Sequence, residues 1–241
     1  FEGRYAGSLL GLVWSFVQPL WQLVLFSFVF SAVMRVPLDG QRTDSFAVFL
    51  FCGLLPWAAI QEGVLRSATA ITENANLVKK LRFPSWLLVA AVVFAALLHE
   101  AIAGGVFIVL LAARGELSLT TLGWLPVAVV LQLALTLGLG ALMAAVQVYF
   151  RDASHALALF FSAWFYLTPI VYPLGLVPER FRGVVEANPL TGLVSLYRHA
   201  LLGGDQGLPP GLVALVATAA AALVLGSWVF SRLQSGFADE V

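Results

Sequence analysis

The stretch that decides the fold is Ser85–Ala113, which reads SWLLVAAVVFAALLHEAIAGGVFIVLLAA and contains only two ionisable side chains, His99 and Glu100. A helix needs roughly 20 apolar residues to cross the hydrocarbon core of a bilayer. The run is continuous rather than alternating, which favours a helix over a strand of a membrane barrel. It therefore predicts a transmembrane helix.

Five further runs have similar length and composition. They are Leu12–Met34, Phe46–Ala70, Leu122–Val148, Ala153–Val171 and Leu208–Phe230. Together with Ser85–Ala113 they predict an all-α integral membrane protein, one transmembrane domain over residues 1–241, with six spans; five or seven spans remain the alternatives.

The composition supports this class and excludes others. The 241 residues are 61% hydrophobic and only 11% charged, whereas soluble domains carry about 25% charged residues. Basic and acidic residues balance at 13 each, which gives no indication of a nucleic-acid partner. The single cysteine, Cys52, lies in an apolar run and supports neither a disulfide framework nor a cysteine metal site.

The beginning of the chain predicts an anchor rather than a cleaved leader. It starts at Phe1 and lacks the basic flank, short apolar core and cleavage site of a signal peptide. Gly3, Gly7 and Gly11 recur on one helical face, a spacing that lets helices approach closely. We interpret them as packing residues of an interfacial helix.

Basic residues near the ends of the runs predict the orientation. Six spans place both termini, the 72–84 connection and the Arg151-Asp152 turn on one side of the membrane. Seven basic residues fall on that side and six on the other, which decides little. Both lysines, Lys79 and Lys80, lie on the first side, which we therefore predict to be cytoplasmic.

The connection 72–84, TENANLVKKLRFP, has helical amphipathic spacing. Leu77, Val78 and Leu81 fall on one face of a short helix, and Lys79, Lys80 and Arg82 on the other. Two interpretations fit this pattern equally well. One is a basic anchor at the lipid headgroups; the other is a helix that docks into a groove of a partner protein.

Ionisable residues within the apolar runs are Glu62, Arg66, His99 and Glu100. A charge at membrane depth costs several kcal/mol unless it is paired or hydrated, so each is a candidate site. Glu62 and Arg66 stand four residues apart with the acid first, which favours a structural pair. His99-Glu100 fits either a polar path or a buried hydrogen-bonded pair.

Aromatic and amide residues follow helical spacing in the first and fifth runs. Such faces could stack on sugar rings and hydrogen-bond sugar hydroxyls, although lipid-facing aromatics are the more common arrangement. The candidate channel-lining residues are Trp14, Gln18, Gln22, Phe26 and Phe30 in the first run and Phe161, Trp164, Phe165 and Thr168 in the fifth.

Several motifs of catalysis are missing. The sequence contains no phosphate-binding loop of the G-x-x-x-x-G-K-[ST] kind, no H-E-x-x-H and no G-x-S-x-G. Nothing in it assembles a nucleophile, a base and an orienting group. We therefore expect that the chain is not an enzyme by itself.

An ordered set of motifs resembles the permease subunits of bacterial ABC exporters for polysaccharides and polyol phosphates, which include the O-antigen, teichoic-acid and capsule permeases. The set runs nearly from end to end of the chain. Its members are the segments at 4–14, 53–57 (GLLPW), 73–84 (ENANLVKKLRFP), 149–152 (YFRD), 166–173 (YLTPIVYP), 188–191 (NPLT), 196–198 (LYR) and 237–239 (FAD).

The resemblance implies roles for particular segments. Residues 1–11 would form an interfacial helix, 72–84 a cytoplasmic coupling helix that docks on an ATPase through residues 76–82 (Asn76 to Arg82), and 172–207 a periplasmic re-entrant segment. The working assembly would be two permeases and two ATPases in the bacterial inner membrane, both termini cytoplasmic, with the first and fifth spans lining a channel. ATP and magnesium would be bound by the ATPase, and no cofactor by this chain.

The function expected from this resemblance is ATP-driven export of a lipid-linked polysaccharide. One alternative is the same architecture exporting a drug or a lipid. A channel or secondary transporter would show broken helices in repeated halves, and no convincing repeat is present. A polytopic membrane enzyme would require a carboxylate cluster or nucleophile, which the sequence lacks.

Overall fold

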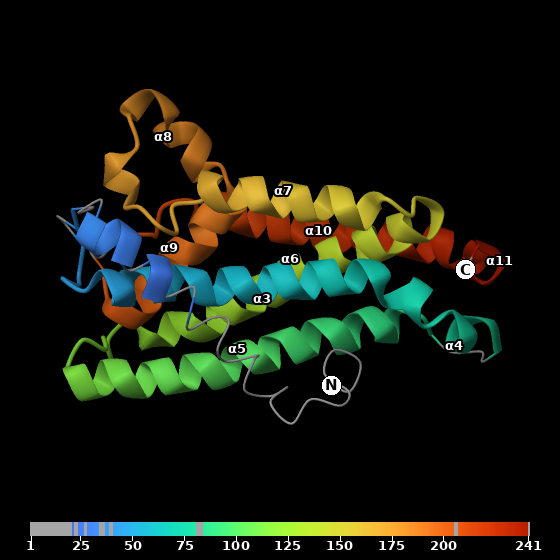
Figure 1. Ribbon diagram of the computed structural model, residues 1–241, viewed down its shortest axis with the longest axis horizontal. Helices are drawn as coiled ribbons and strands as arrows, with labels where there is room; N and C mark the ends of the chain where they lie inside the picture. Colours follow the sequence, from blue (N-terminus) through green and yellow to red (C-terminus); the bar gives the residue numbers. More distant parts are fainter. Residues whose placement is uncertain are drawn as a thin grey trace.

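The computed structural model describes residues 21, 24–26, 28–33, 37–38, 41–80, 84–204 and 207–240. All regular elements in these residues are helices, as the sequence predicts. Four are long and apolar enough to cross a membrane: α3 (Phe46–Glu73), α5 (Trp86–Arg114), α6 (Leu125–Tyr149) and α10 (Leu212–Leu233). They run along the long axis of an elongated bundle (Figure 1).

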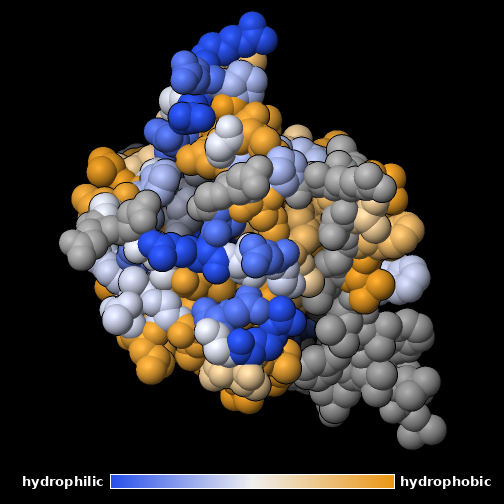
Figure 2. Space-filling view, turned by 90° about the vertical axis from the view of Figure 1, so that its left-hand side faces the viewer, coloured by the Kyte–Doolittle hydropathy of each residue, from blue (hydrophilic) through white to orange (hydrophobic). Residues whose placement is uncertain are grey.

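Shorter elements occupy the two ends of the bundle. One end carries α4 (Ala75–Lys80) and the C-terminal η4 (Gln234–Gly236) and α11 (Phe237–Glu240). The other carries η2 (Leu122–Trp124), η3 (Leu174–Leu176), α8 (Glu179–Glu186) and α9 (Pro189–Leu202) (Figure 1). Viewed from the α9 end, hydrophilic residues cover the middle of the surface and apolar residues surround it (Figure 2). This distribution suits a bundle whose α9 end faces water and whose sides face lipid.

The fifth predicted run forms a shorter helix than expected. The sequence predicts a span over Ala153–Val171, but α7 covers only Ala153–Leu167. Pro169 explains the early end, because a residue that precedes proline is pushed out of the helical region. Thr168 accordingly has an extended backbone, with ψ 134°.

The first predicted run, Leu12–Met34, is described only in part. Trp21 and residues 24–26 are helical, and Phe28–Val33 forms a π-helix, η1. The predicted interfacial helix at 1–11, with Gly3, Gly7 and Gly11, lies outside the described residues.

Small residues bring α6 and α10 together. A Cβ added to Gly138 would fall on the backbone of Ala222 and Leu223, and one added to Gly226 on the carbonyl group of Gly138. Backbones can approach this closely only where side chains are absent, the usual device for packing helices in membranes. Any larger residue at Gly138 or Gly226 would separate the pair.

Two hydrophobic clusters hold the bundle. The larger one joins α3, α6, α7, α9 and α10 and includes Phe49, Leu135 and Tyr197. The smaller one lies towards the α4 end and joins the ends of α3, α5, α6 and α10 to α11, whose Phe237 is fully buried. Helix α9 lies within the 172–207 segment, and most of its apolar side chains belong to the larger cluster.

Candidate functional site

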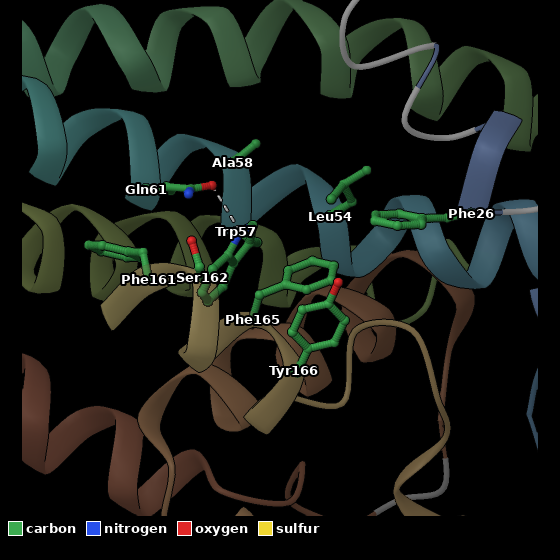
Figure 3. A pocket seen from close by; sticks show the side chains of 9 residues that line it. All are labelled: Phe26, Leu54, Trp57, Ala58, Gln61, Phe161, Ser162, Phe165 and Tyr166. Carbon is green, nitrogen blue, oxygen red and sulfur yellow. Dashed lines mark hydrogen bonds between the residues drawn. The ribbon is translucent and has the colours of Figure 1, made fainter. Parts of the chain in front are cut away.

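A cavity of about 210 Å³ opens between α3 and α7, and we call it the aromatic groove. Aromatic rings, apolar side chains, an amide and two hydroxyl groups line it (Figure 3). The lining residues are Phe26, Leu54, Trp57, Ala58, Gln61, Phe161, Ser162, Phe165 and Tyr166. The groove therefore offers ring faces beside an amide and two hydroxyl groups.

Trp57 is the centre of the groove. Its ring makes edge-on contacts with Phe161, Trp164 and Phe165, with centroids 5.7, 6.4 and 5.5 Å away. Its indole Nε1 donates a hydrogen bond to Gln61 Oε1 at 3.1 Å, one helical turn along α3. The indole is thus fixed in position by three rings and one amide.

The structure brings together only part of the predicted channel lining. Phe26, Phe161 and Phe165 meet in the aromatic groove, where the rings of Phe26 and Phe165 stack at 5.7 Å. Phe30 stacks on Phe46 outside it. Trp14, Gln18 and Gln22 lie outside the described residues, and the channel role of the whole set stays a prediction.

Trp164 and Thr168 belong to a hydrogen-bonded cluster at the end of α7. Trp164 Nε1 donates to Asn188 Oδ1 at 2.9 Å, and Asn188 Nδ2 donates to Thr168 Oγ1 at 3.0 Å. The same Asn188 oxygen accepts from the backbone N–H of Leu190 and caps α9. The cluster ties the start of α9 to the end of α7.

Arg198 is a half-buried cation that the sequence reasoning did not identify as a site. Its guanidinium donates to the carbonyl oxygens of Phe49 (3.3 Å), Pro169 (2.7 Å) and Ile170 (2.8 Å). Its charge also lies 3.5 Å from the centre of the Phe49 ring, a cation–π contact. One side chain on α9 thus clamps α3 and the segment that follows α7.

Glu100 and His99 lie in different environments. Glu100 is buried and accepts from Gln132 Nε2 at 2.5 Å, and Gln132 Oε1 accepts from the hydroxyl group of Tyr197. This chain connects α5, α6 and α9 inside the bundle. It makes Glu100 part of a buried hydrogen-bonded network.

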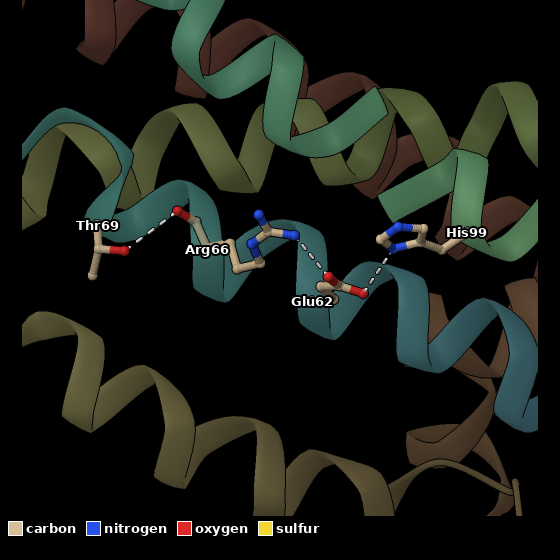
Figure 4. A network of polar contacts seen from close by, with 4 residues as sticks. All are labelled: Glu62, Arg66, Thr69 and His99. Carbon is tan, nitrogen blue, oxygen red and sulfur yellow. Dashed lines mark hydrogen bonds and ion pairs between the residues drawn. The ribbon is translucent and has the colours of Figure 1, made fainter. Parts of the chain in front are cut away.

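His99 instead joins the predicted Glu62–Arg66 pair on the surface of α3. Arg66 Nη1 lies 2.8 Å from Glu62 Oε1, and His99 Nδ1 lies 3.7 Å from Glu62 Oε2 (Figure 4). The Arg66 side chain is 44% exposed and the Glu62 side chain 30%. The predicted ion pair is present, and both of its side chains are partly exposed.

The predicted docking residues lie on and after α4. Asn76, Leu77 and Lys79 are exposed, whereas Val78 packs against the smaller hydrophobic cluster. Lys80 ends the helix, and Leu81 and Arg82 lie outside the described residues. Helix α4 also contacts α11, and this contact holds α4 against the bundle.

At the α9 end, Glu116 forms an ion pair with Arg114 and a hydrogen bond with Thr43 of another loop. Glu116 accepts from Thr43 Oγ1 at 2.7 Å and from Arg114 Nε at 2.6 Å. These hydrogen bonds, that from Thr43 first, lower the pKa of Glu116 below its ordinary value. Elsewhere in the described part of the chain, no group of three or more His, Cys, Asp or Glu is arranged to hold a metal ion.

Comparison with known proteins gives consistent results. Residues 1–202 match the family described as ABC-2 type transporter. The O-antigen export system permease protein RfbA of Myxococcus xanthus is 32% identical, covering 100% of this chain and 91% of the relative. RfbA of Klebsiella pneumoniae is 29% identical, covering 98% of this chain and 89% of the relative. The polysialic acid transport protein KpsM of Escherichia coli is 24% identical, covering 83% of this chain and 77% of the relative.

Proposed function

The chain belongs to the ABC-2 type transporter family, and on this premise we propose that it is the membrane-spanning subunit of an ATP-driven exporter of a lipid-linked polysaccharide. The family inferred from the ordered motifs is thereby the correct one. The observation that carries the proposal is the likeness over the whole chain to a permease named for O-antigen export. Likeness to a polysialic acid transport protein favours a glycan over a drug or a lipid as the cargo.

The proposed topology has six spans with both termini in the cytoplasm. Four long helices supply spans, and the first run and α7 supply the other two. The 15 residues of α7 fall short of the roughly 20 needed, so this span requires its extended continuation to Val171 or a locally thin bilayer. In this topology α8 and α9 form the re-entrant segment on the far side.

The proposed assembly pairs two copies of this chain with two ATPase subunits, which bind ATP and magnesium. The exposed residues of α4 would contact the ATPase, because they combine an apolar group, Leu77, with a cation, Lys79. Hydrolysis would move α4 and, through it, the helices that border the aromatic groove. Rings beside an amide and hydroxyl groups suit stacking on sugars and hydrogen bonding to their hydroxyls.

Substitutions on α4 test the docking part of this proposal. Leu77→Ser combined with Lys79→Glu changes only exposed side chains, so the bundle should remain folded while export falls and the ATPase no longer co-purifies. Val78→Ala is the matched control, since it acts on the inward face of the same helix. It should lower stability while retaining the ATPase. Export and ATPase retention at the wild-type level in the double variant would refute docking through α4.

Complementation tests the function itself. Cells that lack the native permease should accumulate glycan on the inner face of the membrane, and expression of this chain with its ATPase should restore glycan at the cell surface. Restoration of drug resistance or lipid transfer without surface glycan would contradict the proposed cargo.

A further inference from the structure

Glu100 is an acid at a depth where a charge is poorly tolerated. It lies at the midpoint of α5 (Trp86–Arg114), one of the four helices long and apolar enough to cross a membrane. It is only 8% exposed, so the bundle keeps it from bulk water. A charge at this depth is costly unless a partner neutralises it. The charge state of Glu100 therefore depends on the groups packed around it.

Among the described residues, a single hydrogen bond reaches the Glu100 carboxyl group. Gln132 Nε2, from α6, donates to Oε2 at 2.5 Å, whereas Oε1 is buried without a partner in this part of the chain. Gln132 is itself fully buried, and its Oε1 accepts from the hydroxyl group of Tyr197 on α9 at 2.5 Å. A carboxylate has about four acceptor sites and is well stabilised when two or three N–H groups donate to it. One neutral amide provides much less.

The basic side chains nearest to Glu100 in the sequence and in the network are directed elsewhere. On α3, Arg66 pairs with Glu62, and His99, the neighbour of Glu100 on α5, faces the same Glu62 (Figure 4). On α9, Arg198 donates to the carbonyl oxygens of Phe49 on α3 and of the segment after α7. These cations neutralise or bind other groups.

The other helices around the network supply no counter-charge either. Helix α6 contains no charged residue, and its one tyrosine, Tyr149, is its last residue. His199 on α9 lies beside the Trp124 ring, and Arg232 on α10 lies over the Trp228 ring. In the described part of the chain, Glu100 therefore forms no ion pair.

We propose that Glu100 is a proton-binding site: it keeps its proton at neutral pH, and the neutral carboxyl group maintains the network that attaches α9 to α5 and α6. A neutral acid leaves one polar atom unpaired, whereas an ionised acid would leave a charge unpaired, which costs far more. Ionisation would draw water or new donors to the carboxylate and disturb the hydrogen bonds through Gln132. The attachment of α9 is thus sensitive to pH, whatever cargo the protein carries.

Infrared spectroscopy of the chain in lipid bilayers at neutral pH detects this proton directly. Glutamate labelled with carbon-13 at the side-chain carboxyl group separates the glutamate bands from those of aspartate and of lipid esters. We expect a C=O band of a protonated carboxyl group, which Glu100→Gln should remove. Glu62→Gln is the matched control, because it changes the partly exposed acid beside His99, and it should leave this band in place.

Thermal unfolding at several pH values tests whether the proton stabilises the fold. In the unfolded chain a glutamate loses its proton above a pH of about 4.3, whereas the folded chain keeps the proton on Glu100. The folded state then binds one proton more than the unfolded state, so its stability falls as pH rises. Between about pH 5 and about pH 7, the Tm of the wild type should fall relative to that of Glu100→Gln by about 3–5 °C per pH unit.

Two outcomes would overturn the inference. If Glu100→Gln removes only a carboxylate band, Glu100 is ionised in the folded chain. If the Tm profiles of the wild type and Glu100→Gln run parallel, folding does not change the proton occupancy of this residue. Should Glu100→Gln fail to fold, Glu100→Asp supplies the same infrared test, because an unlabelled aspartate takes the band out of the labelled set.

Discussion

Arg198→Met is the substitution whose effect the structure predicts most directly. The guanidinium is the donor for three backbone carbonyl groups, those of Phe49, Pro169 and Ile170. Methionine fills a similar volume but donates no hydrogen bond, so all three oxygens lose this partner. The contact with the Phe49 ring loses its electrostatic part as well.

The magnitude follows from these contacts. A hydrogen bond from a charged donor contributes about 1.5–3 kcal/mol, so three independent bonds would give about 4.5–9 kcal/mol. They share one side chain, so their energies do not add fully, and loss of the half-buried cation also removes part of its desolvation cost. We expect a destabilisation of about 3–5 kcal/mol. At about 2–4 °C per kcal/mol for a chain of this size, the apparent Tm should fall by about 10 °C.

Thermal unfolding of the purified protein in detergent measures this effect. Arg180→Met is the matched control: Arg180 is exposed on α8, with its guanidinium over the Phe181 ring, so its loss should cost about 0.5 kcal/mol or less. Arg198→Lys should fall between the two, because one ammonium cannot reproduce the planar fork that reaches two segments. Equal Tm values for Arg198→Met and Arg180→Met would refute the clamp.

Three further substitutions test other contacts. Tyr197→Phe leaves the side-chain oxygen of Gln132 without its hydroxyl donor. It should lower the free energy of unfolding in detergent by about 1–3 kcal/mol. An unchanged Tm would show that this hydrogen bond does not stabilise the fold. Phe237→Ala empties the centre of the smaller cluster and should cost about 3–5 kcal/mol, against about 1 kcal/mol for Phe237→Leu; equal losses would show that the ring is not packed. Glu116 has a lowered pKa through Thr43, so it stabilises the fold above its unfolded pKa of about 4.3 and this contribution is lost as pH falls through the folded value. Glu116→Gln should abolish that part of the acid dependence of Tm, and an unchanged profile would contradict it.

The positions of the long helices could be predicted from hydrophobic runs alone. Ser85–Ala113 corresponds to α5 within one residue at each end, because Pro84 precedes the helix and Gly115, with φ 71°, terminates it. The boundary at Leu208 is wrong by four residues. Pro209, Pro210 and Gly211 delay the start of α10 to Leu212, and a hydropathy window does not register this local backbone effect.

The length of α7 and the existence of α8 were harder to predict from the sequence. Pro169 was visible in the sequence, but the apolar residues that follow it extended the predicted span to Val171. The α8 segment is too polar and too short to appear as a run. Its order comes from the chain on either side, which Asn188 and Arg198 hold in place.

Contacts between distant segments could not be predicted from the sequence. Gln132 and Tyr197 are 65 positions apart, and each alone is an ordinary polar residue in an apolar run. Trp57 and Gln61 did show the four-residue spacing that places them on one face, but only the approach of α7 turned that face into a groove. Periodicity identifies a face of a helix; it does not identify what covers that face.

Pro56 gives these contacts a mechanical consequence. A proline inside a helix lacks the N–H that would bond to the carbonyl group four residues earlier, so α3 has its weakest backbone link there. On one side of this link Phe49 is held by Arg198, and on the other the helix continues to Glu73, just before α4. A displacement of α4 therefore reaches Pro56 along a helix segment that packs against α5 and α6. The residue next to that link is Trp57, the centre of the aromatic groove, so the groove lies where a displacement of α4 would bend α3 with the least resistance.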